Sequence, residues 1–323
     1  MDKQNKYLSS TVNSRFSIVA SGITKTFDKG NVLAVDNVSL EIAKGELFGL
    51  IGPDGAGKTS VFRILTTLLL ADKGTASVNG FDVVKDYRDI RNYIGYMPGK
   101  FSLYQDLTVK ENLEFFASIF GTTVEANYDL IKDIYDQIKP FNNRRAGKLS
   151  GGMKQKLALC CALIHKPQVL FLDEPTTGVD VVSRREFWEI LEKLKKQGIT
   201  ILVSTPYMDE ANLCGRIALM QNGKIMSVDT PKNIITAYPT TLYAVKANDI
   251  YKLLNDLRKN DQVNSSYPFG EYLHVTMKND TGETVQQLKE YVTQNGNTNV
   301  EVKPVEPTVE DSFISLMDLS VSK

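Results

Sequence analysis

Apolar positions in the first two thirds of the chain form short runs that alternate with segments of helical spacing. The runs at 46–51, 169–174 and 199–203 are mostly uninterrupted, which is typical of strands buried on both faces. Weaker strand patterns lie at 16–20, 38–42 and 76–80. Helical spacing follows at 60–65, in a helix expected to end near 71–74, and then at 107–140, 153–163 and 183–196. This alternation predicts an α/β domain with a ligand site at the carboxyl edge of its sheet.

The pattern changes near residues 238–240. Strand patterns at 242–246, 262–267, 271–277 and 299–303 now enclose helical patterns at 250–258 and 284–293. The resulting β-α-β-β-α-β order predicts a small ferredoxin-like α+β domain over 240–303, after a large domain over 16–238. We expect residues 1–15 to be a flexible N-terminus and 304–323 to form a helix, over about 309–319, and a tail.

Composition and charge exclude several classes of protein. The 38 Lys and Arg residues balance the 38 Asp and Glu residues, so no basic field favours a nucleic-acid partner. No apolar run reaches the roughly 18 residues that a membrane span needs, and residues 1–14 lack the apolar core of a secretion signal. Cys160, Cys161 and Cys214 lack metal-binding spacing and suit a reducing cytosol.

One motif dominates the candidate chemistry. Residues 52–59 read GPDGAGKT and fit the pattern of a phosphate-binding loop between a strand and a helix. Its glycines let successive backbone N–H groups turn toward an anion, and the helix N-terminus adds positive charge. We expect Lys58 to reach the β- and γ-phosphates of ATP and the Thr59 hydroxyl to ligate Mg²⁺. The candidate ATP-binding residues here are Gly52, Pro53, Asp54, Gly55, Ala56, Gly57, Lys58, Thr59 and Ser60.

Two carboxylates end the apolar run at 169–174. Asp173 is placed to bind both the nucleotide and Mg²⁺, and Glu174 stands one residue further, where it could polarise a water attacking the γ-phosphate. By itself the pair could equally be two surface acids before Pro175. Together with the loop at 52–59, it predicts a catalytic role for Glu174.

A second anion-binding helix start lies at residues 149–153, which read LSGGM. Ser150 is placed to cap the following helix, and Gly151 and Gly152 expose backbone N–H groups. This motif, together with the order of the other motifs, resembles the ATP-binding cassette (ABC) family over roughly 16–230. The resemblance implies a P-loop cassette with a mixed sheet core and a helical signature subdomain. It also implies that Phe27 stacks on adenine with Val35 nearby.

The family works as a head-to-tail sandwich, so the resemblance implies that Ser150, Gly151 and Gly152 serve the ATP of a second cassette, with Asp180 at the interface. The phrases at 183–188 and 207–211 are similar to those of bacterial multidrug, ABC-2-type exporters. Such ATPases hydrolyse ATP to ADP and phosphate and pair with separate membrane permeases on the cytoplasmic face of the inner membrane. An apolar and aromatic cluster between Phe101 and Phe116 is then either core or part of a groove for a permease helix.

Two positions depart from the family pattern. A glycine, Gly99, stands where the family has a glutamine, and Pro206 stands where it has a histidine. Neither residue offers a side-chain donor, and such a loss could slow turnover roughly a hundredfold. Two hypotheses stay open: a homodimer that hydrolyses ATP with Glu174 as base, or a weakened, regulatory half of a heterodimer. A non-transport cassette is disfavoured, because the chain has neither a second cassette nor a long coiled-coil pattern.

Overall fold

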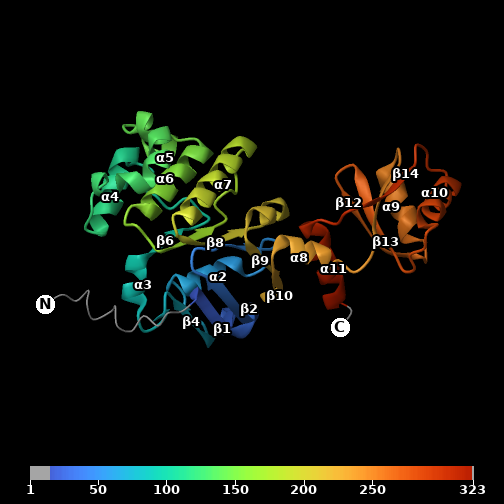
Figure 1. Cartoon of the computed structure of the whole chain (residues 1–323), viewed down its shortest axis with the longest axis horizontal. Helices are drawn as coiled ribbons and strands as arrows, with labels where there is room; N and C mark the ends of the chain where they lie inside the picture. Colours follow the sequence, from blue (N-terminus) through green and yellow to red (C-terminus); the bar gives the residue numbers. More distant parts are fainter. Residues whose placement is uncertain (1–14, 322–323) are drawn as a thin grey trace. The chain divides into compact units, whose positions relative to one another are not determined.

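The computed structural model describes residues 15–321, which divide into two compact units, Met1–Lys232 and Asn233–Lys323 (Figure 1). The predicted flexible N-terminus falls, except for Arg15, outside the described residues, as do the last two residues of the predicted tail. Within the described part of the chain, no helix combines the length and apolarity needed to cross a bilayer.

The first unit contains a six-stranded sheet in the order β10-β9-β3-β8-β7-β6. These strands span, in that order, Lys224–Asp229, Arg216–Gln221, Leu47–Ile51, Thr200–Thr205, Val169–Asp173 and Ile94–Met97. All pairs are parallel except β10 with β9. Every residue of β3, β7 and β8 is buried, which explains their continuous apolar runs and confirms the three central strands predicted from the sequence.

A second, antiparallel sheet in this unit has the order β2-β1-β4-β5. Its strands are β1 (Phe16–Phe27), β2 (Val32–Ala43), β4 (Lys73–Val78) and β5 (Phe81–Asp82). Buried side chains of both sheets and of helix α2 (Lys58–Leu65) share one core. Phe62 of α2 meets Phe171 of β7 edge to face with ring centroids 6.1 Å apart. This packing fixes the position of α2, whose first turn contains the end of the phosphate-binding loop.

The helix predicted to end near 71–74 is shorter in the structure. It ends at Leu65, because the Thr66 hydroxyl donates to the Phe62 carbonyl at 2.8 Å and Thr67 adopts a left-handed backbone with φ of 64°. The N–H of Leu68 then donates to the Arg63 carbonyl at 2.8 Å and closes the turn.

The helical stretch expected over 107–140 is divided in the structure. The structure has two helices there, α4 (Val109–Ile119) and α5 (Tyr128–Ile138). Gly121, with φ of 65°, breaks the spiral, and the Asn127 side chain holds the connection by donating to the Thr122 hydroxyl and to the Ile164 carbonyl.

The remaining helices of the first unit are α3 (Tyr87–Tyr93), α6 (Gly151–Leu163) and α7 (Val181–Lys196). Helices α4, α5 and α6 lie together as a helical group, in green in Figure 1. Short 3₁₀ turns span Asp28–Gly30 (η1), Glu125–Asn127 (η2), Lys139–Phe141 (η3), Ala146–Lys148 (η4) and Met208–Leu213 (η5), and helix α8 covers Pro231–Thr236.

The second unit has the β-α-β-β-α-β element order expected from the sequence. Its elements are β11 (Leu242–Lys246), α9 (Ile250–Arg258), β12 (Val263–Phe269), β13 (Tyr272–Met277), α10 (Thr284–Gln294) and β14 (Glu301–Val305), followed by α11 (Val309–Val321). The strands form one antiparallel sheet in the order β12-β13-β11-β14. Tyr243 and Val245 pack in one core with Leu253 of α9 and Leu288 of α10.

Helix α11 is tied to this sheet by a buried acid. The Asp311 Oδ1 lies 2.6 Å from the His274 Nδ1 and accepts from the Tyr267 hydroxyl at 2.8 Å. The other oxygen, Oδ2, accepts from the Thr308 N–H and hydroxyl, which caps the start of the helix.

Candidate nucleotide-binding site

The loop at 52–59 leaves the carboxyl end of β3 and enters α2. Two of its glycines are required by close approach of other backbone segments. A Cβ added at Gly52 would lie 2.1 Å from the Met220 carbonyl oxygen, and one at Gly57 would lie 2.2 Å from that of Ala34, at a φ of 104°. Only glycine allows this compact loop, whose N–H groups and helix start suit a phosphate.

Lys58 is the buried cation of the loop. Its Nζ donates to the carbonyl oxygens of Gly52 and Pro53 at 2.8 and 3.0 Å, and lies 3.1 Å from the Glu174 Oε1. The Lys58 side chain is only 2% exposed, so the ammonium is held inside the loop and not in bulk solvent. A buried ammonium beside a glycine loop fits a phosphate chemically, because charge-assisted hydrogen bonds to phosphate oxygens are strong.

Asp173, at the end of β7, is brought to the first turn of α2. The Thr59 hydroxyl lies 3.3 Å from the Asp173 Oδ1, which also accepts from the Ser204 hydroxyl at 2.7 Å. One carboxylate beside one hydroxyl is the kind of donor set that Mg²⁺ uses when nucleotide phosphates and water complete its shell. Among the described residues, no group of three or more His, Cys, Asp or Glu side chains is arranged to hold a metal ion.

Glu174 has an unusual backbone. Its φ is 50°, a left-handed conformation that costs a non-glycine residue roughly 1–2 kcal/mol. The Glu174 N–H donates to the Ser204 hydroxyl at 2.9 Å, which holds this conformation. The strained backbone places the Glu174 carboxylate, 21% exposed, against Lys58 at the mouth of the loop.

Ser204 is a site residue that the sequence analysis missed. Its hydroxyl donates to Asp173 and accepts from the Glu174 N–H, so it fixes both predicted acidic residues. The available signal was positional: Ser204 and Thr205 are polar residues at the carboxyl end of a central apolar strand, where ligand sites of such sheets lie.

The signature segment begins helix α6. The Ser150 hydroxyl accepts from the Met153 N–H, as the predicted cap does. Ser150 and Gly151 are exposed, whereas Gly152 is buried against Ser183, whose Oγ would lie 2.6 Å from a Cβ at position 152. Two of the three residues thus face outward, and the third packs the segment onto α7.

The two candidate adenine contacts differ in exposure. Phe27, at the end of β1, is 40% exposed, and its ring centroid lies 5.8 Å from the Lys25 Nζ. Val35 is 0% exposed and belongs to the core shared by the two sheets. The packing of Val35 supports the neighbouring strand, and its place near the adenine stays a prediction.

Gly99 borders the residues that carry the two predicted carboxylates, and Pro206 lies two residues after the Ser204 that binds both of them. A Cβ added at Gly99 would lie 3.0 Å from the Asp173 carbonyl oxygen and 3.7 Å from the Glu174 Cβ. Pro206 directly follows Thr205, the last residue of β8, next to the Ser204 that holds Glu174. Neither Gly99 nor Pro206 has a side-chain hydrogen-bond donor.

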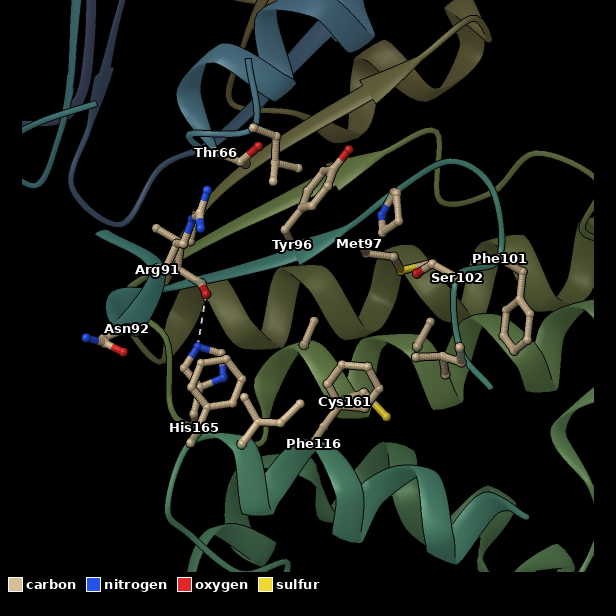
Figure 2. Close-up of a pocket in the computed structure, with 18 of the residues that line it drawn as sticks. Thr66, Arg91, Asn92, Tyr96, Met97, Phe101, Ser102, Phe116, Cys161 and His165 are labelled. Carbon is tan, nitrogen blue, oxygen red and sulfur yellow. Dashed lines mark hydrogen bonds between the residues drawn. The ribbon is translucent and has the colours of Figure 1, made fainter. Parts of the chain in front are cut away.

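A cavity of about 470 Å³ opens beside β6, between this strand and helices α4 and α6 (Figure 2). Its walls are mostly apolar and include Met97, Phe101, Leu103, Phe116, Ile119 and Phe120. Part of the predicted apolar cluster therefore lines a groove, whereas Leu113 is fully buried core.

Two polar side chains of this groove, His165 and Tyr96, have pKa values shifted by burial. The His165 Nε2 lies 2.9 Å from the Ile94 carbonyl, its ring stacks on Phe120 at 3.8 Å, and burial lowers the His165 pKa (Figure 2). The His165 side chain is half-buried. Burial and the nearby Asp173 raise the pKa of Tyr96 to about 12, which keeps this phenol protonated as a donor.

The loop, the paired carboxylates and the signature segment define an ATP-binding cassette, and the chain belongs to the family of ATP-binding subunits of ABC transporters. The family model described as ABC transporter matches residues 35–177. The chain is 38% identical over 305 residues, 93% of its length, to the probable multidrug ABC transporter ATP-binding protein YbhF of Escherichia coli. The match covers 52% of that protein, so the chain spans about half the length of this relative.

Two further relatives match over a larger share of their own lengths. The doxorubicin resistance ATP-binding protein DrrA of Mycobacterium tuberculosis is 36% identical over 69% of this chain and 68% of its own length. The ABC transporter ATP-binding protein NatA of Bacillus subtilis is 39% identical over 62% of this chain and 83% of its own. A solved cassette described as a dimeric post-hydrolysis state bound to ADP and Pi matches 66% of this chain and 98% of its own, with a TM-score of 0.60 and 25% identity.

Proposed function

We propose that this chain is the ATP-hydrolysing subunit of a bacterial ABC exporter, which couples ATP binding and hydrolysis to separate permease subunits at the cytoplasmic face of the membrane. The observation that carries the proposal is the convergence of Lys58, Thr59, Asp173 and Glu174 at one sheet edge. Names of the relatives that refer to multidrug transport and doxorubicin resistance support an export role.

Each of these residues has a separate task in the proposed reaction. Lys58 holds the β- and γ-phosphates, while Thr59 and Asp173 hold Mg²⁺, which neutralises charge on the phosphates when it is bound. Glu174 accepts a proton from the attacking water. Its carboxylate reaches the loop because Ser204 fixes its backbone, so the geometry of the base depends on a residue of the neighbouring strand.

A second cassette completes the proposed site. Ser150 and Gly151 are exposed at the start of α6, where their hydroxyl and N–H groups could bind a phosphate of a partner's ATP. Phe27, exposed at the end of β1, is the proposed stacking surface for adenine of the chain's own ATP.

The groove beside β6 is the proposed docking site for a cytoplasmic helix of the permease. Its volume of about 470 Å³ and apolar walls suit the hydrophobic face of a helix. Exposed Ile119 and Leu68, 58% and 55% accessible, extend this apolar surface. Pro98 of the groove precedes Gly99, so the docking site and the nucleotide site share one backbone segment.

A second candidate function is a weakened cassette that binds ATP and serves as the regulatory half of a heterodimer. Gly99 and Pro206 favour it, since Gly99 borders Glu174, Pro206 lies two residues after the Ser204 that binds the Glu174 N–H, and neither has a side-chain donor. The intact Glu174 favours the first function.

ATP turnover by the purified chain tests both. We expect slow turnover that falls at least about a hundredfold in Glu174→Gln, while ATP affinity stays within about threefold. Glu189→Gln is a matched control, because Glu189 is an exposed partner of Arg185 outside the site. Tight binding with turnover equal in the parent and Glu174→Gln would instead establish the regulatory half.

A further inference from the structure

One buried carboxylate that the proposed reaction does not use joins three segments around Glu174. Glu210, in η5, is only 1% exposed. Its Oε1 accepts from the Thr176 hydroxyl at 2.8 Å, and its Oε2 accepts from the Thr205 hydroxyl at 2.5 Å. The Arg184 Nε lies 3.7 Å from Oε1 and completes the surroundings of this acid.

Each partner belongs to a different segment of the site. Thr176 lies two residues after Glu174, on the turn that leads to α7. Thr205 ends β8, immediately after the Ser204 that fixes Glu174 and immediately before Pro206. Arg184 lies in the first turn of α7, and its guanidinium stacks over the Tyr207 ring at 4.2 Å. Glu210 therefore joins the turn that follows Glu174 to the end of β8, which holds the Glu174 backbone.

Because Glu210 is buried, the loss of any of its hydrogen bonds would cost free energy. A carboxylate removed from water costs several kcal/mol unless its oxygens are hydrogen-bonded and its charge is compensated. Here both oxygens are occupied, and the Thr205 hydroxyl also accepts from the Tyr207 N–H at 3.1 Å. A satisfied buried network of this kind favours one arrangement of the segments that it joins.

We propose that Glu210 is a positioning residue for ATP hydrolysis, one that holds the turn at 174–180 and the segment at 204–207 in the arrangement that aims Glu174. The inference rests on the proposed function, since it assigns Glu210 to the same reaction. Pro206, next to Thr205, donates no hydrogen bond of its own to this segment. It has neither an N–H nor a side-chain donor, so this segment is fixed from the Glu210 side and not by a side chain on the nucleotide.

Three variants test this role in the intact chain, with steady-state turnover, ATP affinity and amide hydrogen exchange measured on each. Glu210→Ala removes both bonds and is expected to lower kcat about tenfold, with KM and ATP affinity changed less than about twofold. Exchange should rise at 174–180 and 204–207 and stay unchanged in the central strands β3 and β7. Thr176→Val removes one hydrogen bond of the network at nearly constant side-chain volume. If Glu210→Ala does not fold, the kcat and hydrogen exchange of Thr176→Val test the proposal.

Glu210→Gln is the conservative variant. Its amide oxygen and NH₂ group can meet both threonine hydroxyls, so it should recover most of the kcat that Glu210→Ala loses. Glu189→Gln again serves as the control of equal charge change.

An unchanged kcat in Glu210→Ala and Thr176→Val overturns the proposal. So does a loss of ATP affinity that accompanies raised exchange throughout the first unit, because that is the signature of a merely structural tie. If the parent does not hydrolyse ATP, the proposed function fails. Hydrogen exchange then still decides the role of Glu210: a rise confined to the two segments supports it, and a uniform rise or none contradicts it.

Discussion

The phosphate-binding loop with its two carboxylates and the pair of positions at Gly99 and Pro206 border the same site but differ in what they supply. The first region presents a buried ammonium, a hydroxyl and two acidic side chains within hydrogen-bonding reach of one another. The second borders the same carboxylates but has no side-chain donor at either position. Groups that hold the nucleotide are thus kept, and groups that would steady its γ-phosphate are absent.

This difference separates binding from turnover. Interactions that are equal in the ground state and the transition state set affinity, whereas those made only in the transition state set the rate. Under the proposed function, we expect the retained region to set the affinity for ATP and the lack of side-chain donors at Gly99 and Pro206 to lower the rate. We therefore expect the chain to bind ATP tightly and to hydrolyse it slowly.

Removal of the buried cation should have the largest effect. In Lys58→Ala, ATP affinity is expected to fall at least about a hundredfold, because a charge-assisted contact to phosphate is lost inside a nearly closed loop. Titration with a fluorescent ATP analogue measures this. Lys110→Ala, which removes an exposed ammonium paired with Glu114, is the control and should bind as the parent does. Equal affinities in Lys58→Ala and the parent would show that the loop is not the phosphate site.

Loss of the Thr59 hydroxyl should lower ATP affinity only when Mg²⁺ is present. Thr59→Val is expected to lower ATP affinity about tenfold in the presence of Mg²⁺ and to leave it unchanged in EDTA, because the hydroxyl acts as a metal ligand beside Asp173. Isothermal titration with and without Mg²⁺ measures both. A loss of the same size in EDTA would mean that Thr59 acts on the loop and not on the metal.

Loss of the Ser204 hydroxyl, which binds the Glu174 N–H from β8, should have a moderate effect on kcat. Ser204→Ala removes the hydroxyl's bonds to Asp173 and to the Glu174 N–H, while the Glu174 N–H keeps its bond to the Ser204 carbonyl at 3.1 Å. The variant is expected to lower kcat about fivefold, with little change in affinity. Steady-state kinetics separate the two quantities. A drop in affinity with constant kcat would place Ser204 in binding.

Replacement of the proline without a new donor should have the smallest effect. Pro206→Ala adds a backbone N–H but no side-chain donor, so kcat is expected to stay within about twofold of the parent. The same kinetic assay checks it. A larger rise would show that the N–H, and not a side chain, is what this position lacks.

The sequence predicted the parts of the site that short segments define by themselves. Gly57, Lys58, Thr59, Asp173 and Glu174 lie in two contiguous stretches whose neighbours are apolar strands, and both stretches fold as expected. The three central strands were predictable because their residues are buried on both faces.

The rest depends on contacts between distant segments. Strands β6, β9 and β10 were not predicted, since each is short or alternates weakly and is stabilised by its neighbours in the sheet. The break at Gly121 is held by Asn127, whose partner Ile164 directly follows the distant helix α6. Glu210 resembles an ordinary helix-face acid in the sequence, and only the fold brings it to Thr176.

The most direct test of the account restores the missing donors. Gly99 has an ordinary backbone, and a Cβ there requires its neighbours to move only slightly, so Gly99→Gln and Pro206→His can be combined in one chain. ATP affinity and kcat are measured for the parent, for this double variant and for the double variant with Glu174→Gln. We predict equal affinities, a kcat raised at least about tenfold in the double variant, and loss of that gain with Glu174→Gln. A folded double variant whose kcat does not exceed that of the parent would contradict the claim that the absent donors limit turnover.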